Sequence, residues 1–186
     1  MKLNDLFFLV CTALIVFVLC IPMTVSASEG SNGSNDPADT IQESFYNWSL
    51  TCSIQHNRRK CVISQKQYDE QTGQGRLSIE LVRFTPNRVY GYLLLPLDLS
   101  ISSGVVMHLD NVLFGSTRPF RTCTLAGCIV PIEFHSKLIF RLRTGNKLEF
   151  RAVVSNGDDI SFTVLLVGFS EALDRALMLV AWDVIG

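Results

Sequence analysis

Histidine and carboxylate side chains are the first residues to test for catalytic or metal-binding chemistry. The three histidines, His56, His108 and His135, are scattered, and none has a cysteine or carboxylate at a ligand-like interval. Asp158 and Asp159 are adjacent and follow Asn-Gly, which is typical of a turn rather than of opposed catalytic carboxylates. No nucleophile elbow or phosphate-binding loop occurs. The sequence therefore predicts neither a catalytic site nor a metal site, and it implies no cofactor.

Cysteines are the second group of residues to test, because they can form disulfides, bind zinc or carry out redox chemistry. Cys11 and Cys20 lie in an apolar N-terminal segment, which leaves Cys52, Cys61, Cys123 and Cys128 in the rest of the chain. Four cysteines allow three connectivities, and the local pairs Cys52 with Cys61 and Cys123 with Cys128 are favoured because each closes a short loop. The spacings fit neither a zinc knuckle nor a C-x-x-C redox motif. We expect two structural disulfides and hence an oxidising compartment.

Basic side chains supply the candidate binding surface. Arg58, Arg59 and Lys60 lie in the turn-like stretch 53–60 between two cysteines, so a disulfide would display the three cations together. Two interpretations stay open: a solvated turn, or an electrostatic contact with an anionic surface (anionic lipid or lipopolysaccharide) or a receptor. Arg118 and Arg121 flank Pro-Phe next to Cys123, which suits an interface and strand packing equally.

The N-terminus predicts export. Residues 6–21 carry no charge, and Lys2 precedes them. A small-residue run ending at Ala27 suits signal peptidase, so we expect a signal peptide over residues 1–27 and a periplasmic, outer-membrane-associated or secreted protein. An uncleaved segment would instead anchor the chain in the inner membrane. Residues 28–44 are predicted to be a flexible linker, and residues 45–186 a single domain. The net charge of -1 argues against nucleic acid as a partner.

Period-two alternation dominates the domain. It predicts seven to nine short strands and two short helices, and these point to an all-β fold, an antiparallel immunoglobulin-like β-sandwich. Asn156-Gly157 marks the clearest hairpin turn, and Trp48 and Leu50 are expected to face the core. The helices are expected at residues 136–144 and after Gly168. The strands are expected at residues 46–52, 61–65, 76–84, 89–95, 105–109, 119–123, 128–134, 148–154 and 160–166.

Several of these features together resemble a known family over residues 45–177. The resemblance rests on Trp48 with Cys52, Cys61-Val62-Ile63 with Gln65, residues 93–97 running into Gly104, Pro119-Phe120-Arg121-Thr122-Cys123 with Gly127-Cys128, and Gly168-Phe169 before Ala172-Leu173. In this order they resemble the invasion-associated locus B proteins of alphaproteobacteria. Asp98 is a departure, because the family often has Gly there. The resemblance implies an exported β-sandwich without catalytic residues, some of whose relatives are linked to host-cell entry.

From these observations we expect a non-enzymatic protein of the bacterial envelope that acts by binding and supports interaction with host cells. Its partner would be an envelope or host-cell surface protein or an anionic surface. Two alternatives stay open: a small periplasmic enzyme whose site comes from residues distant in sequence, and an envelope-maintenance protein anchored in the inner membrane.

Overall fold

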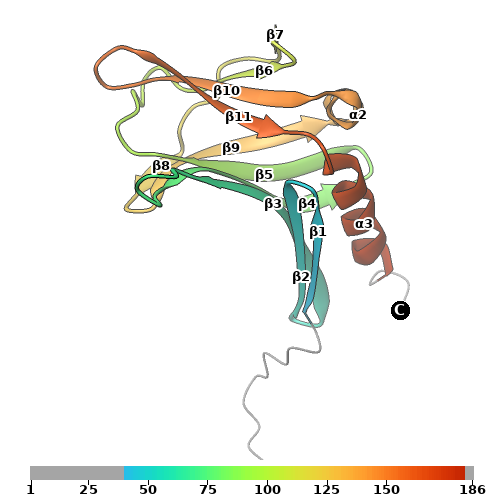
Figure 1. Ribbon diagram of the computed structural model, residues 1–186. Helices are drawn as coiled ribbons and strands as arrows, with labels where there is room; N and C mark the ends of the chain where they lie inside the picture. The colour runs from blue at the N-terminus through green and yellow to red at the C-terminus, as the bar shows by residue number, and fades with distance from the viewer. Residues whose placement is uncertain (1–39, 183–186) are drawn as a thin grey trace, which may run out of the picture. The chain divides into compact units, whose positions relative to one another are not determined.

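The computed structural model describes residues 40–182, which form two antiparallel sheets and two helices (Figure 1). The first sheet has seven strands, in the order β1 (Ile41–Phe45), β2 (Trp48–Gln55), β3 (Arg58–Tyr68), β4 (Gly75–Thr85), β5 (Arg88–Leu95), β9 (Gly127–His135) and β8 (Thr122–Thr124). The second has four, in the order β11 (Asp159–Leu165), β10 (Lys147–Val153), β6 (Val106–Leu109) and β7 (Val112–Leu113). The predicted signal peptide and residues 28–39 of the predicted linker lie outside the described residues.

Short turns make the first five strands neighbours in chain order. The turn between β2 and β3 is only His56-Asn57, and both residues have positive φ, 52° and 59°. Two such residues form the turn whose twist matches a right-handed hairpin, and Asn is favoured in it. The hairpin predicted at Asn156-Gly157 is confirmed, with β10 and β11 paired from Lys147 opposite Leu165 to Val153 opposite Asp159.

Alternating apolar residues and the two helices build the core. Trp48 and Leu50 are both buried, as predicted from the alternation along β2. Helix α2 (Ser136–Thr144) buries Leu138, Ile139 and Leu142. Helix α3 (Phe169–Trp182) buries Phe169, Ala172, Leu173 and Ala176, which recur at i, i+3, i+4 and i+7 and so form one face. The predicted helices are therefore confirmed.

Helix α3 lies against the β1–β4 part of the first sheet. The ring of Phe169 packs on that of Trp48, with centroids 5.3 Å apart, and Arg175 of α3 forms an ion pair with Glu43 of β1 at 2.7 Å. The side chains of Trp48 and Glu43 therefore point to the helix side of the sheet. We call this side the inner face of the first sheet and the opposite side the outer face.

Polar side chains join the two sheets. Gln67 Nε2 of β3 donates a hydrogen bond to the carbonyl of Thr163 in β11 at 2.6 Å, and Trp48 Nε1 donates to the carbonyl of Leu165 at 2.9 Å. Because β11 is the last strand of its sheet, these bonds satisfy backbone groups that have no strand partner on that side.

The all-β class, the antiparallel sheets, the two helices and the two local disulfides are confirmed. Cys52 is bonded to Cys61 across the β2–β3 hairpin, and Cys123 to Cys128 across the β8–β9 hairpin. The described residues form eleven strands rather than the predicted seven to nine. The additional strands are β7, which has two residues, and β1, which lies in the predicted linker.

The boundary of the predicted linker is therefore wrong at its C-terminal end. Strand β1 begins at Ile41, and its five residues pair with β2 from Ile41 opposite Cys52 to Phe45 opposite Trp48. The ordered domain thus starts before residue 45. The alternation in β1 is weak because only Ile41 and Phe45 are apolar, so pairing with β2 determines this strand.

Asp98, the departure from the family pattern, adopts the backbone conformation that Gly takes most readily. Its φ is 75°, and its carboxylate accepts a hydrogen bond from the Ser155 hydroxyl. Asp is one of the few residues that tolerate this left-handed region, because its short side chain can bond locally. Asp98 therefore adopts this conformation without strain that only Gly could avoid.

Candidate functional site

The basic run lies in a strand. The prediction that residues 53–60 form a turn is wrong, because β2 continues to Gln55 and β3 begins at Arg58. Ser53, Ile54 and Gln55 pair with Lys60, Arg59 and Arg58. The pairing is possible because the sharp His56-Asn57 turn uses only two residues.

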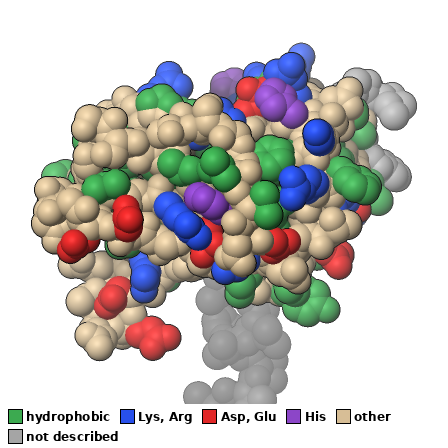
Figure 2. All heavy atoms as spheres, turned by 90° about the horizontal axis from the view of Figure 1, so that it is seen from above, with side chains coloured by type: hydrophobic (Ala, Val, Ile, Leu, Met, Phe, Trp, Pro, Cys, Tyr) green, Lys and Arg blue, Asp and Glu red, His purple; other side chains and the backbone are tan. Residues whose placement is uncertain are grey.

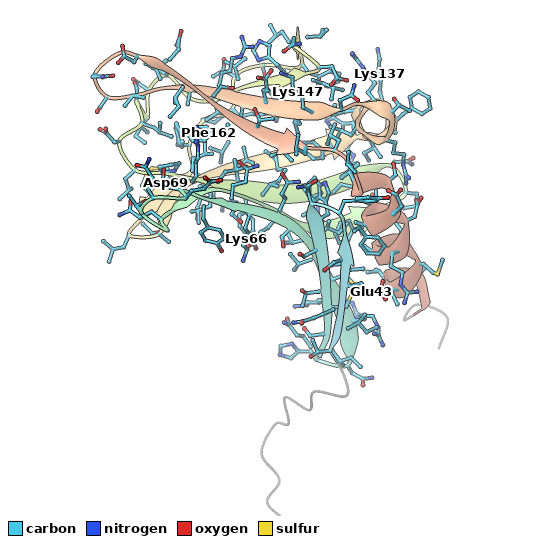
Figure 3. The ribbon with its side chains drawn as sticks, in the orientation of Figure 1. Glu43, Lys66, Asp69, Lys137, Lys147 and Phe162 are labelled. Atoms are coloured by element: carbon cyan, nitrogen blue, oxygen red, sulfur yellow. A yellow bond between two sulfur atoms is a disulfide. The ribbon has the colours of Figure 1, made fainter. Side chains whose placement is uncertain are left out.

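Strand geometry separates the three cations. Successive side chains of a strand point to opposite faces, so Arg58 and Lys60 share a face, whereas Arg59 points to the other. Arg59 has the same orientation as the buried Cys61 and Ile63, and it is half-buried. Arg58 and Lys60 are exposed and share the outer face with Lys66, which Figure 3 shows on the side away from the second sheet. The expectation that all three cations are displayed together is therefore wrong.

The outer face carries more cations than the overall charge of the chain suggests. Its strands present six basic and two acidic side chains outward: Arg58, Lys60, Lys66, Arg76, Arg83 and Arg88 against Glu80 and Glu133. Asp69 and Glu70 follow β3 and lie beside Arg76, so their negative charges offset the charge of Arg76. The excess of positive charge on the outer face therefore comes from the other five cations. This asymmetry is local, since the whole chain has a net charge of -1.

Both outward carboxylates are already engaged. Glu80 lies 3.6 Å from Lys66 Nζ and accepts a hydrogen bond from the Tyr92 hydroxyl. Partial burial and this bond raise the pKa of Tyr92 to about 12. Glu133 forms an ion pair with Arg88 at 2.6 Å. The guanidinium of Arg83 lies over the ring of Tyr90 at 4.0 Å. Arg58 and Lys60 are exposed, and within residues 40–182 neither of them forms an ion pair.

Two shallow hollows meet at Lys66. One, of about 620 Å³, lies over β1–β3 and is lined by the hydroxyl side chains Ser44, Ser49, Thr51 and Ser64, with Gln42, Glu43, Asn47, Leu50 and Lys66. The other, of about 190 Å³, is lined by Lys66, Tyr68, Ser78 and Glu80, among others. Both lie on the outer side of the strands, so the face is recessed where they meet. The first hollow is mostly polar, whereas Leu77, Leu94, Leu95 and Ala126 add apolar side chains to the second.

Arg118 and Arg121, the second predicted basic surface, lie on different parts of the fold. The backbone of Arg118 forms a two-way hydrogen-bonded bridge with Val105, next to the second sheet. Arg121 donates its backbone N–H to the carbonyl of Ile129 and so continues the edge of the first sheet before β8. Neither residue lies on the hairpin that carries Arg58 and Lys60.

Most of the residues first considered for catalysis lie in turns or beside a helix, where they make local contacts. His56 forms a turn, and His135 precedes α2 with Nδ1 3.7 Å from Glu133 Oε1. Asn156 and Asp158 bond to each other within their turn, at 2.8 and 3.0 Å. Within residues 40–182, no group of three or more His, Cys, Asp or Glu side chains could hold a metal ion.

A buried carboxylate on the second sheet was not predicted. Glu149 of β10 is only 8% exposed and lies 3.4 Å from Lys147 and 3.7 Å from Arg151, opposite His108 of β6. Figure 2 views this side of the molecule and shows cationic, acidic, histidine and apolar side chains interspersed. The alternation Lys147, Glu149, Arg151 in the sequence could have indicated a charged face, but not its burial.

The comparisons with known proteins agree with one another. The family model described as "Invasion associated locus B (IalB) protein" matches residues 48–177. The chain is 33% identical over 139 residues to an invasion protein B homolog of Brucella abortus (strain 2308), covering 74% of this chain and 80% of the relative. It is 30% identical over 141 residues to invasion protein B of Bartonella bacilliformis, covering 74% and 75%.

A solved structure extends the likeness to the fold. The crystal structure of invasion associated protein b from Bartonella henselae superimposes with a TM-score of 0.69 at 28% identity, and the match covers 75% of this chain and 96% of that one. The family match begins at Trp48 and ends at Leu177, so it includes both disulfides and the contact between Trp48 and α3. The chain therefore belongs to the invasion associated locus B (IalB) family.

Proposed function

We propose that this protein is an exported, non-enzymatic component of the bacterial envelope that supports host-cell interaction by binding an anionic surface. Family membership supports the link to invasion, since the relatives are named invasion proteins. Two disulfides are consistent with an oxidising compartment and hence with export. Among residues 40–182 no helix is long and apolar enough to span a membrane.

One observation carries the binding part of the proposal: Arg58, Lys60 and Lys66 are exposed on the same outer face of β3. The contacts of α3 with Trp48 and Glu43 are on the inner face, so this helix leaves the three cations accessible. Cations held along one strand attract an anionic surface with little loss of backbone entropy, because the sheet already fixes their spacing.

The test compares two variants that each lose three positive charges. The face variant is Arg58→Ser, Lys60→Ser and Lys66→Ser. The matched variant is Lys137→Ser, Arg141→Ser and Arg151→Ser, which removes cations outside the strands of the first sheet. We expect the face variant to lose most of its association with isolated bacterial envelopes and intact host cells at physiological salt. The matched variant should associate as the parent protein does.

Salt and stability provide the controls. Association of the parent protein should weaken as salt rises, because exposed charges are screened over about 8 Å at physiological ionic strength. Each surface substitution should change the free energy of unfolding by no more than about 0.5 kcal/mol. If the face variant associates as well as the parent at low and physiological salt, the outer face does not bind an anionic surface and the proposal is wrong.

Export is tested separately. A cleaved signal predicts that the mature chain begins at Ser28 and is recovered from the periplasmic or secreted fraction. Intact-mass measurement and N-terminal sequencing of the protein extracted from the envelope distinguish this outcome from an anchored form. Recovery of the chain with Met1 in the inner-membrane fraction would contradict it.

A further inference from the structure

We infer that the anionic ligand of the outer face is an acidic polysaccharide, a chain of sugars that carries sulfate or carboxylate groups. The inference rests on the proposed function and names its ligand class. It comes from what surrounds the cations: the hydroxyl-lined hollow over β1–β3, the exposed ring of Tyr68, and the length over which Arg58, Lys60 and Lys66 are spread.

The hollow offers groups that suit sugar hydroxyls. Ser49 and Ser64 are paired across β2 and β3, and Ser44 of β1 lies opposite Ser49, so three hydroxyls form one row across the sheet. A serine hydroxyl both donates and accepts hydrogen bonds, as a sugar hydroxyl does. Thr51 and Gln42 also line this hollow, and they pair with each other across β1 and β2. The floor is therefore polar and mostly uncharged, and Lys66 lies at its rim.

Tyr68 adds an apolar ring to this polar surface. It follows Lys66 by two residues on the outer face of β3, its side chain is 61% exposed, and it lines the second hollow together with Lys66. An exposed aromatic ring offers a flat apolar surface with a polar hydroxyl at its end, which suits a ligand that is apolar on one side and polar at its rim. The apolar face of a sugar ring meets this description.

The spacing of the cations indicates a polymer. Arg58 and Lys66 are eight residues apart in one strand, which corresponds to about 26 Å at a rise of about 3.3 Å per residue. A monosaccharide or a single phosphate group cannot reach both ends of this row. A chain with an acidic group at intervals can place one group near Lys66 and others near Lys60 and Arg58, where charge-assisted hydrogen bonds form.

A membrane surface fits the same cations less well. Peripheral binding to a bilayer uses apolar side chains that insert between headgroups, together with basic residues. Among the strand residues of the outer face, the large apolar side chains with substantial exposure are Tyr68 and Val82, of which Val82 is 41% exposed. Tyr46 and Leu125 are also exposed, but each lies in a separate turn at the end of a hairpin. The face is also recessed near Lys66, whereas a flat bilayer requires a protruding surface.

The experiment measures the binding of the whole protein, with both disulfides intact, to four probes. They are heparin as a sulfated polysaccharide, polygalacturonate as a carboxylated one, dextran as a neutral one, and vesicles of phosphatidylglycerol. We expect binding to heparin or polygalacturonate and none to dextran. The face variant should weaken this binding about tenfold, as expected for the loss of three exposed charge contacts, while the matched variant changes it less than twofold.

Two further variants test the sugar contacts, which a merely electrostatic attraction would not need. Tyr68→Ala and the pair Ser49→Ala with Ser64→Ala leave the charge unchanged. We expect each to weaken polysaccharide binding about threefold to tenfold, with no change in the weaker binding to vesicles. If both bind heparin and polygalacturonate as the parent does, the face acts only as an ion exchanger and the inference is wrong.

The outcomes also separate this inference from the proposed function. One outcome would be that the parent protein binds phosphatidylglycerol vesicles but neither acidic polysaccharide, and that the face variant no longer binds the vesicles. This outcome would contradict the polysaccharide as the ligand but would support the proposed binding to an anionic surface. Equal binding of the parent and the face variant to all probes would overturn both.

Discussion

The side-chain amide of Gln65 in β3 forms two hydrogen bonds with the backbone of Leu165 in β11. Its Nε2 donates to the Leu165 carbonyl at 2.9 Å, and its Oε1 accepts from the Leu165 N–H at 3.2 Å. The amide thus replaces the strand that β11 lacks on this side. Gln65 is only 4% exposed, and its side chain links the two sheets through these hydrogen bonds.

Replacing Gln65 by Leu should lower the free energy of unfolding by about 1 to 3 kcal/mol, because the backbone N–H of Leu165 loses its partner in a partly buried position. Denaturant unfolding measures the change. Gln55→Leu, at an exposed position of β2, is the matched control and should stay within about 0.5 kcal/mol of the parent. Equal stability of the two variants would contradict the role of Gln65.

Gly168 should tolerate no side chain. Its φ is 88°, and a Cβ atom there would lie 2.0 Å from the carbonyl oxygen of Phe45. Gly168→Ala is expected to cost about 3 kcal/mol or more of stability, because Phe45 belongs to a paired strand that cannot move freely. Gly157→Ala provides the comparison, since Gly157 also has positive φ, 97°, but open space around it. That variant should cost only about 1 to 2 kcal/mol. Thermal unfolding measures the loss of stability in both variants, and an equal loss in the two would contradict the prediction.

Tyr92 should titrate at a higher pH in the folded protein than in the unfolded chain. Its pKa is raised from 10.0 to about 12 by burial and by the bond to Glu80, so the folded state holds the proton more tightly than the unfolded state does. The resulting stability is complete below pH 10 and is lost as the pH rises from 10 toward 12. Tyrosinate absorbance, followed with circular dichroism to verify the fold, should show a group that titrates near pH 12 and that is absent in Tyr92→Phe. Glu80→Gln should lower its pKa, and an unchanged titration in that variant would contradict the contact.

Glu43 should contribute to stability in mildly acidic solution. The hydrogen bond and the charge of Arg175 hold its pKa below 4.5, so this contribution is present above the unfolded-state value and is lost as the pH falls through the folded-state value. In Glu43→Gln the loss of stability near pH 4 should be smaller than in the parent, and Glu70→Gln, in the exposed β3–β4 turn, should behave as the parent. Denaturant midpoints from pH 3 to pH 7 measure the difference.

The two disulfides should differ in their resistance to reduction. Cys52 and Cys61 are 0% and 2% exposed, whereas Cys123 is an exposed residue of the edge strand β8. Mild reduction followed by alkylation and peptide mapping should label Cys123 and Cys128 first. Full reduction should lower the melting temperature without unfolding the domain, because the core extends well beyond both bonds. Complete unfolding on mild reduction would contradict this prediction.

Local patterns in the sequence determined most elements of the fold. Alternation predicted seven to nine strands, helical spacing predicted both helices, and Asn156-Gly157 predicted its hairpin turn, because each signal depends on neighbours within a few residues. The disulfide pairs could be favoured for the same reason, since each joins cysteines no more than nine residues apart. Strand β1 was missed because its residues form a strand only beside β2.

The tertiary structure decided which side chains act together. Arg58, Arg59 and Lys60 are consecutive in the sequence, but the exact length of the hairpin turn fixes the face to which each one points. Lys66 and the serines of β1 and β2 join Arg58 and Lys60 through strand register. The partner of Gln65 lies 100 residues away. Such contacts depend on the sum of many weak interactions over long loops, and a local pattern of residue types does not contain that information.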